Sequence, residues 1–179
     1  MNKQEGIQQI TRLVKKYENL SLADRRRYNE SMTCKDLILP LFQALGWDVY
    51  NKISDYEVTS ETQVSGGRVD YAFHLDGVTK FFIEAKKIET DLREARWAEQ
   101  AITYAWHKSV AWAFLTDFES IKVFNAEWDE LDTEQNLVFE VSYKNYLIDQ
   151  RLWLLSKESV EEGKLNKYAE KNFKKPKRE

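Results

Sequence analysis

The sequence predicts an α/β fold in which helices flank a mixed central β-sheet. Three observations predict this class: amphipathic helical spacing near the start, two alternating runs that form a hairpin, and a continuous apolar run, Val110–Thr116, typical of a buried central strand. The chain has 179 residues and 42% hydrophobic content, which is enough for one domain with a substantial core.

The first quarter of the chain is expected to be helical. Residues 3–20 carry apolar side chains at helical spacing and predict an amphipathic helix that packs on the domain. A second helix should end near Gly46, and Pro40 should kink it or mark its tighter half. The apolar positions are Ile7, Ile10, Leu13, Val14 and Tyr17 in the first helix, and Leu37, Ile38, Leu41, Phe42 and Leu45 in the second.

The middle of the chain alternates strands with one helix. The helix is predicted over Glu89–His107, where small residues (Ala95, Ala98, Ala101, Ile102 and Ala105) form a face that can pack against the sheet. Val110–Thr116 follows as the central strand. The other predicted strands are Trp47–Tyr50, Tyr56–Val64, the hairpin runs Arg68–Leu75 and Thr79–Lys86, Ser120–Asn125, and Leu137–Val141 at an edge.

The end of the chain is expected to close the domain. Leu147, Leu152, Trp153 and Leu155 suggest helices that complete a domain over residues 1–156. Residues 157–179 read as a polar helix followed by a basic tail or linker, because lysine and arginine accumulate around Pro176.

Composition and missing motifs exclude several classes of protein. A formal charge of −3 argues against a chain whose main function is to bind nucleic acid tightly. One cysteine, Cys34, excludes an internal disulfide, and two histidines make a histidine-based zinc centre a poor fit. No nucleotide-binding loop occurs, which argues against ATPase or dinucleotide chemistry. Without a long apolar run or a secretory signal, the expected location is the cytoplasm, with no membrane contact.

Three polar residues stand in the hairpin where such strands are normally apolar: Asp70, Glu84 and Lys86. Side chains alternate across a strand, so Glu84 and Lys86 share a face opposite Ile83 and Ala85, and Asp70 joins them if both apolar sets face one core. Two carboxylates and an ammonium on a half-buried face are costly unless a ligand uses them. A divalent cation held by hard oxygen ligands is the simplest such ligand.

The hairpin loop is constrained by this arrangement. Asp76-Gly77 is a strong turn signal. For Asp70 to lie opposite Glu84, however, Leu75 must pair with Thr79, which predicts an odd-length loop, Asp76-Gly77-Val78. A two-residue loop that pairs Leu75 with Val78 is compatible with the site only if a bulge restores the register.

The ordered set of motifs resembles the PD-(D/E)xK nuclease superfamily, and in particular the N-terminal nuclease domain of type I restriction R subunits and of fused type II restriction-modification enzymes. The resemblance covers roughly residues 28–155 and rests on Asp70 with Glu84-Ala85-Lys86, on Leu39–Phe42 with Ala44–Val49, on Gly67–Tyr71 and Phe82–Lys87, and on Gln100 with Tyr104.

This resemblance implies a restriction-endonuclease-like core that hydrolyses DNA phosphodiester bonds. Asp70, Glu84 and the Ala85 carbonyl would bind Mg²⁺, or Mn²⁺ as a substitute, in a one- or two-metal arrangement. Lys86 would orient or deprotonate water, or stabilise the transition state.

The resemblance also implies three accessory residues. Glu30 would add an acidic group from the first core helix, although a glutamate favoured by the helix dipole is the alternative. Gln100 and Tyr104 would match a Gln-x-x-x-Tyr element, and Trp97 continues their stripe on the same helix; the alternative is that they are surface residues.

Other functions remain open at this point. The three polar residues could form a structural salt bridge, or the chain could be a catalytically silent nuclease fold that serves as a DNA-docking or interaction module. An RNA or repair nuclease of the same superfamily is a further alternative. For restriction, we expect DNA as the partner, with further domains or subunits for recognition, methylation or translocation.

Overall fold

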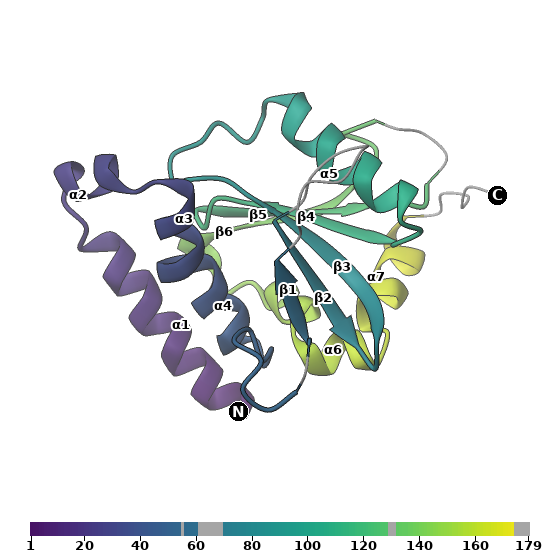
Figure 1. Ribbon diagram of the computed structural model, residues 1–179, viewed down its shortest axis with the longest axis horizontal. Coiled ribbons are helices and arrows are strands. Elements are labelled where there is room, and N and C mark those ends of the chain that lie inside the picture. Colours follow the sequence, from purple (N-terminus) through teal and green to yellow (C-terminus); the bar gives the residue numbers. More distant parts are fainter. Residues whose placement is uncertain (55, 61–69, 129–131, 174–179) are drawn as a thin grey trace.

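The computed structural model describes residues 1–54, 56–60, 70–128 and 132–173, which form a six-stranded sheet flanked by helices (Figure 1). The strands lie in chain order across the sheet. β3 and β4 are parallel and all other neighbours antiparallel, so the sheet is mixed and the predicted fold class is confirmed. The strands are β1 Val58–Ser60, β2 Tyr71–Leu75, β3 Val78–Ala85, β4 Trp112–Thr116, β5 Ser120–Asn125 and β6 Leu137–Ser142.

Helices form most of the N-terminal and C-terminal parts of the described chain. None of the helices in these ranges has the length and apolar character needed to cross a bilayer. The α-helices are α1 Lys3–Glu18, α2 Leu22–Arg27, α3 Glu30–Thr33, α4 Leu39–Ala44, α5 Ala95–His107, α6 Lys157–Glu161 and α7 Lys164–Asn172; a π-helical turn, η1, spans Cys34–Ile38, and 3₁₀ turns span Tyr143–Asn145 (η2) and Gln150–Leu155 (η3).

Two hydrophobic cores lie on opposite faces of the sheet. Ile83 and Ala85 of β3 belong to the larger core, which includes residues of α1, α4 and α7. Phe82 of the same strand belongs to the smaller core, which packs against α5. Figure 1 shows α5 on one side of the sheet and α1, α4, α6 and α7 on the other. Alternation along β3 therefore directs Glu84 towards the α5 side.

Aromatic stacking fixes the larger core around β3. The ring of Phe81 lies 4.5 Å from Phe73 on β2 and 4.4 Å from Phe114 on β4, measured between centroids. All three side chains are fully buried, and burial of each contributes about 2–3 kcal/mol. On the other face, Ala101 and Ala105 let α5 approach the sheet closely. The strand that carries the candidate site is thus held rigidly from both sides.

Helix α1 forms where the periodicity predicts it, and its predicted apolar positions are buried except for Ile7. Asn2 and Glu5 form a capping box at its start. Ile7, predicted to be buried, is 40% exposed, whereas Gly6 is buried. A Cβ at residue 6 would overlap the carbonyl oxygen of Ala44 on α4. The glycine permits the close contact between the helices, and that contact turns Ile7 towards solvent.

The helix around Pro40 widens instead of tightening. Residues Cys34–Ile38 form a π-helical turn, closed by the N–H of Leu39 donating to the carbonyl of Cys34. Proline lacks the N–H that would bond to residue 36 and its ring crowds the preceding turn, so a wider turn accommodates it. The expectation of a tighter half was wrong. Gly46 ends this helical region with a φ of +99°, as the sequence predicts.

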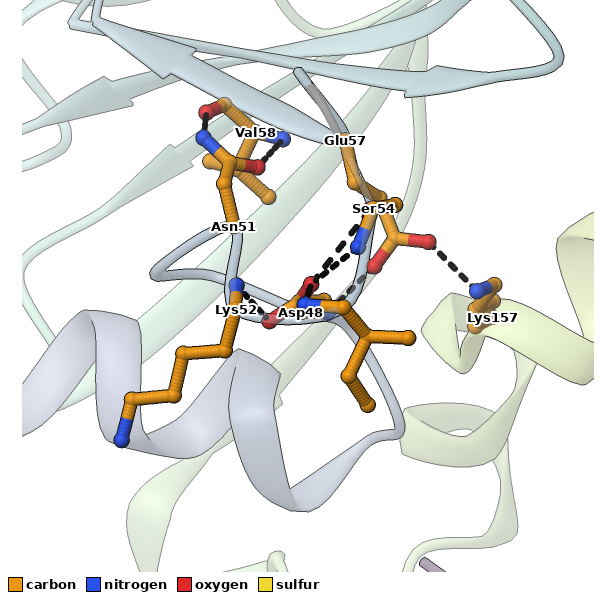
Figure 2. Close-up of polar contacts among 8 residues, drawn as sticks. Asp48, Asn51, Lys52, Ser54, Glu57, Val58 and Lys157 are labelled. Atoms are coloured by element: carbon orange, nitrogen blue, oxygen red, sulfur yellow. Dashed lines mark hydrogen bonds and ion pairs between the residues drawn. The ribbon is translucent and has the colours of Figure 1, made fainter.

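The predicted strand Trp47–Tyr50 is wrong, because this segment is part of a loop. The Asp48 carboxylate accepts the backbone N–H groups of Lys52, Ile53 and Ser54 at 2.8–3.0 Å (Figure 2). These bonds, that of Ser54 first, hold the pKa of Asp48 at about 2. The side chain of Asp48 thereby replaces a strand partner for the backbone and folds the chain back on itself.

Each remaining predicted strand has a counterpart in the structure, but β4 starts two residues later than predicted, at Trp112, and β3 ends one residue earlier, at Ala85. β4 is buried throughout, β5 has the predicted bounds, and β6 extends the predicted edge strand by one residue. Of Tyr56–Val64, only Val58–Ser60 is a strand within the described residues. The start of the first hairpin run, residues 68–69, and the basic end, residues 174–179, lie outside the described residues.

Lys157 on α6 anchors the loop by pairing with Glu57, which is 5% exposed (Figure 2). Their nitrogen and oxygen lie 2.5 Å apart, and Glu57 also accepts the N–H of Asp48. Lys157→Met should therefore lower the free energy of unfolding by about 1–3 kcal/mol, since it leaves a buried carboxylate without its cation. Urea denaturation measures the change. Lys164→Met, which removes a surface pair with Glu162, is the control; an equal loss would contradict the prediction.

Candidate active site

The hairpin turn is a two-residue loop, so the predicted three-residue loop is wrong. Leu75 pairs with Val78, and Asp76 and Gly77 both have positive φ, at 51° and 77°. The register then shifts at a bulge: His74 pairs with Thr79, whereas Phe73 pairs with Phe81. Lys80 is the extra residue. Beyond the bulge the pairing follows the register that the sequence argument required.

This register brings Asp70 beside Glu84. The N–H of Asp70 donates to the carbonyl of Ile83 at 2.9 Å, continuing the ladder past Tyr71. The Asp70 carboxylate accepts the N–H of Ala85 at 2.7 Å. That bond fixes one carboxylate oxygen at the carboxyl end of β3. The predicted neighbourhood of Asp70, Glu84 and Ala85 is present, although it arises through a bulge.

Lys86 and Glu84 form a buried ion pair on the α5 side of the sheet. Lys86 Nζ lies 2.7 Å from Glu84 Oε1, and the two side chains are only 12% and 4% exposed. The backbone N–H of Lys86 donates to the Thr116 carbonyl at 2.9 Å, which extends the parallel pairing of β3 with β4. The site therefore sits where two parallel strands end, a common place for ligands in sheets of this kind.

The second oxygen of Glu84 has no hydrogen-bond partner within the described part of the chain. This atom, Oε2, is buried. Burial raises the pKa of Glu84 to about 7; the negative charges of Asp70 and Glu30 raise it too, while Lys86 opposes them. A buried acceptor without a donor is destabilising and calls for a ligand. A hard cation would satisfy Oε2 and also relieve the repulsion among the carboxylates.

Glu30 approaches the same site from α3. Asn29 caps this helix by accepting the N–H of Met32 at 2.8 Å, as the sequence allows. Thr33 ties α3 to the end of β3 by accepting the N–H of Ile88 at 3.2 Å. Glu30 is close enough for its charge to raise the pKa of Glu84.

Cys34 lies within the same negative field. Burial is the first cause that raises its thiol pKa to about 12, and the charges of Asp70, Glu30 and Glu84 add to it. The negative charges of three carboxylates therefore all raise the pKa of this one thiol. No group of three or more His, Cys, Asp or Glu side chains is close enough to form a ready metal cluster in the ranges that the structure describes. Any bound cation would therefore draw on Asp70, Glu84 and backbone oxygens.

Tyr104 is not a surface residue. It is 4% exposed and its ring packs edge-on against Phe82 at 4.9 Å, two residues before Glu84 on β3. Gln100 lies one turn earlier on α5 and is partly buried. The helix begins at Ala95, six residues later than predicted. The segment before it forms turns in which Asp91 accepts the N–H of Arg93 at 3.0 Å.

Trp97, which sequence reasoning placed only on a helical stripe, contacts the Lys86 side chain of the candidate site. The Lys86 ammonium lies 4.1 Å from the centre of its indole ring. Spacings of three and seven residues from Gln100 and Tyr104 put Trp97 on their side of α5. This helical spacing was the sequence feature that could have pointed to Trp97. The contact with Lys86 depends on how α5 packs across the sheet.

A cavity of about 460 Å³ lies beyond the ends of β3 and β4, and Asp70, Glu84 and Lys86 are not among its described lining residues. Among the residues that line it are Arg25, whose guanidinium stacks on Tyr17 at 4.6 Å, and Asp117, which follows β4 directly. Asp117 is 2% exposed. Burial raises its pKa to about 7, and the charge of Glu119 contributes.

Asp117→Asn should become more stable relative to the wild type as pH rises. The folded-state pKa of Asp117 lies above the unfolded value of about 3.9. The free energy of unfolding of the wild type therefore falls as the pH rises from about 4 to about 7. The variant lacks this loss, and its Oδ1 can still accept the Ser120 N–H. The advantage should grow by about 2–4 kcal/mol from pH 4 to pH 8. Denaturation curves at both pH values test this; a constant difference would contradict it.

The fold and site together define an α/β domain with an acidic, lysine-containing centre at the end of its parallel strands. This chain is similar to the "Type II restriction enzyme and methyltransferase RM.Eco57I" of Escherichia coli. The two are 28% identical over 164 residues, which cover 84% of this chain and 16% of the larger protein. No protein-family model matches the chain, and no solved structure matches it.

Proposed function

We propose that this chain is a metal-dependent endodeoxyribonuclease module of a restriction or restriction-modification system. The observation that carries the proposal is the buried Oε2 of Glu84, which has no hydrogen-bond partner among the described residues and is set beside Asp70 and the Lys86 ammonium. Similarity to part of a restriction enzyme and methyltransferase supports the restriction role. A structural salt bridge would account for Lys86 and one Glu84 oxygen, but it leaves the other oxygen unsatisfied.

The donor set fits Mg²⁺, with Mn²⁺ as a substitute. Asp70, Glu84 and the Ala85 carbonyl offer hard oxygen atoms near one strand end, which is the ligand type that these ions prefer. When bound, a divalent cation would lower the pKa of a water molecule and neutralise charge that develops on the phosphate. Glu30 would add negative charge that favours the cation, in keeping with its effect on the pKa of Glu84.

The chain's own residues have distinct tasks in this proposal. The Ala85 N–H holds one oxygen of Asp70 in place. Glu84 holds the Lys86 ammonium through Oε1, so that Lys86 can orient the attacking water or donate to a phosphate oxygen as negative charge accumulates there. Gln100 and Tyr104 would support this face from α5.

Recognition of the target would come from further domains or subunits. With a charge of −3, the chain lacks the cationic surplus that tight binding to DNA requires. The matched region covers only 16% of the similar restriction enzyme, which leaves most of that protein for further domains. We therefore assign cleavage to this chain, and sequence recognition, methylation or translocation to its partners.

Cleavage of plasmid DNA tests the proposal. The purified chain at micromolar concentration should nick or linearise supercoiled plasmid with Mg²⁺ or Mn²⁺ and lose this activity in EDTA. Linear duplex, single-stranded DNA and RNA of matched length define the substrate class. Binding of DNA without cleavage under every metal condition would favour a silent docking module, and cleavage of RNA alone would reassign the substrate.

A further inference from the structure

Trp97 occupies an unusual position beside the proposed catalytic lysine. It is the third residue of α5, and its ring centre lies 4.1 Å from Lys86 Nζ. The Arg96 guanidinium lies at the same distance from this ring, but Arg96 is 67% exposed and pairs with Glu94 at 2.7 Å. Lys86 is 12% exposed, so its cation–π contact is far less screened by water.

The indole N–H of Trp97 is buried and has no hydrogen-bond partner within the described residues. Buried tryptophans usually find an acceptor for this group, because leaving it unsatisfied is destabilising. Glu84 Oε2 is buried and unsatisfied as well, and both residues contact the same Lys86 ammonium. The site thus presents one unmet donor and one unmet acceptor around a single cation.

A phosphodiester accompanied by a divalent cation is the ligand class that meets both needs. The cation satisfies a carboxylate oxygen, while a non-bridging phosphate oxygen accepts an N–H. An anion alone would leave Glu84 Oε2 unsatisfied, and a metal alone would leave the indole N–H unsatisfied. Since β3 holds Glu84 and Lys86 while α5 holds Trp97, the ligand would bridge strand and helix.

We infer that Trp97 contacts the substrate and positions Lys86: its N–H donates to a non-bridging oxygen of the DNA phosphate, and its ring holds the Lys86 ammonium. This inference rests on the proposed nuclease function and adds a phosphate-contacting residue to it. The two roles use different parts of the indole, so separate substitutions can test them.

Trp97→Phe removes the N–H and keeps an aromatic ring, whereas Trp97→Leu removes both. Trp106→Phe is the matched control, because Trp106 lies on the same helix and is 36% exposed. Trp97→Phe should lower kcat/KM for plasmid cleavage about tenfold, the size expected for one hydrogen bond to a charged group. Trp97→Leu should lower kcat by a further three- to tenfold through loss of the cation–π contact. Trp106→Phe should cleave like the wild type.

Fluorine NMR on protein labelled with 5-fluorotryptophan gives a readout that does not depend on cleavage. The Trp97 resonance is assigned by its absence in Trp97→Phe. It should move in Lys86→Met without DNA, and in the wild type when a short duplex is added together with Ca²⁺, while the Trp106 resonance stays in place.

The outcomes separate this inference from the proposed function. If Trp97→Phe and Trp106→Phe cleave equally well, the phosphate contact is overturned; if the Trp97 resonance ignores Lys86→Met, the positioning role is overturned. If the wild type cuts no nucleic acid, the nuclease proposal and the phosphate contact fail together, whereas the Lys86→Met shift still decides the positioning role. Melting temperatures identify any variant that fails to fold. If Trp97→Leu does not fold, the comparison of Trp97→Phe with Trp106→Phe still tests the inference.

Discussion

Replacing Asp70 or Glu84 by alanine is expected to lower DNA cleavage at least about a thousandfold, because each substitution removes an oxygen donor to the proposed metal. Glu84→Gln is the sharper variant, since its amide oxygen can still accept from Lys86 while the charge is lost. Glu99→Gln is the matched control: Glu99 is exposed on α5 and carries the same charge. Plasmid cleavage rates for the four variants measure the effect.

The same carboxylates should control a metal-dependent gain in stability. A ligand that binds only the folded state stabilises it by about 2.7 kcal/mol at one hundred times its Kd, so Mg²⁺ should raise the wild-type melting temperature. Asp70→Ala and Glu84→Gln should lose both this shift and the cleavage, yet fold without metal. If Asp70→Ala unfolds the chain while Mg²⁺ leaves the wild type unchanged, the three polar residues form a structural salt bridge.

Local periodicity was sufficient to predict the faces of β3. Glu84 and Lys86 alternate with Ile83 and Ala85, and the structure places the apolar pair in the core shared with α1, α4 and α7. A period of two is a property of the strand itself, so it holds without knowledge of the partner strand. The fold class was predictable for the same reason, from patterns that are each read within a short stretch.

The hairpin shows how two correct local rules can conflict. Asp76-Gly77 favours a two-residue turn, whereas the placement of Asp70 opposite Glu84 requires a register that such a turn cannot give. The prediction from sequence met the register requirement by assuming a three-residue loop. The structure keeps the short turn and inserts a bulge at Lys80, and nothing in the residue pattern distinguishes these two solutions.

Contacts between distant segments were beyond the reach of the sequence. Trp47–Tyr50 has the composition of a strand, but Trp47 instead donates its indole N–H to the Leu155 carbonyl at 2.9 Å, across more than one hundred residues. Trp97 was identified only as part of a helical stripe, and its partner Lys86 comes from another element. Tertiary packing decides both, which is why periodicity placed the residues and missed their roles.

Lys86→Met should separate catalysis from metal binding. The substitution removes the ammonium that orients water or stabilises charge on the phosphate, so cleavage should fall at least about a thousandfold. Glu84 Oε1 then loses its hydrogen bond to Lys86, so both oxygens of this carboxylate favour the binding of a cation. Mg²⁺ should therefore raise the melting temperature of Lys86→Met by at least as much as that of the wild type.

Lys87→Met makes this test specific, because Lys87 is the exposed neighbour and its loss changes the net charge equally. It should cleave at a rate close to the wild type. If both variants lose cleavage to the same extent, general attraction of DNA explains the result and Lys86 has no special role. If Lys86→Met fails to fold even with Mg²⁺, the buried pair with Glu84 holds the fold together. Retained metal stabilisation without cleavage is the combination that assigns Lys86 to the chemical step.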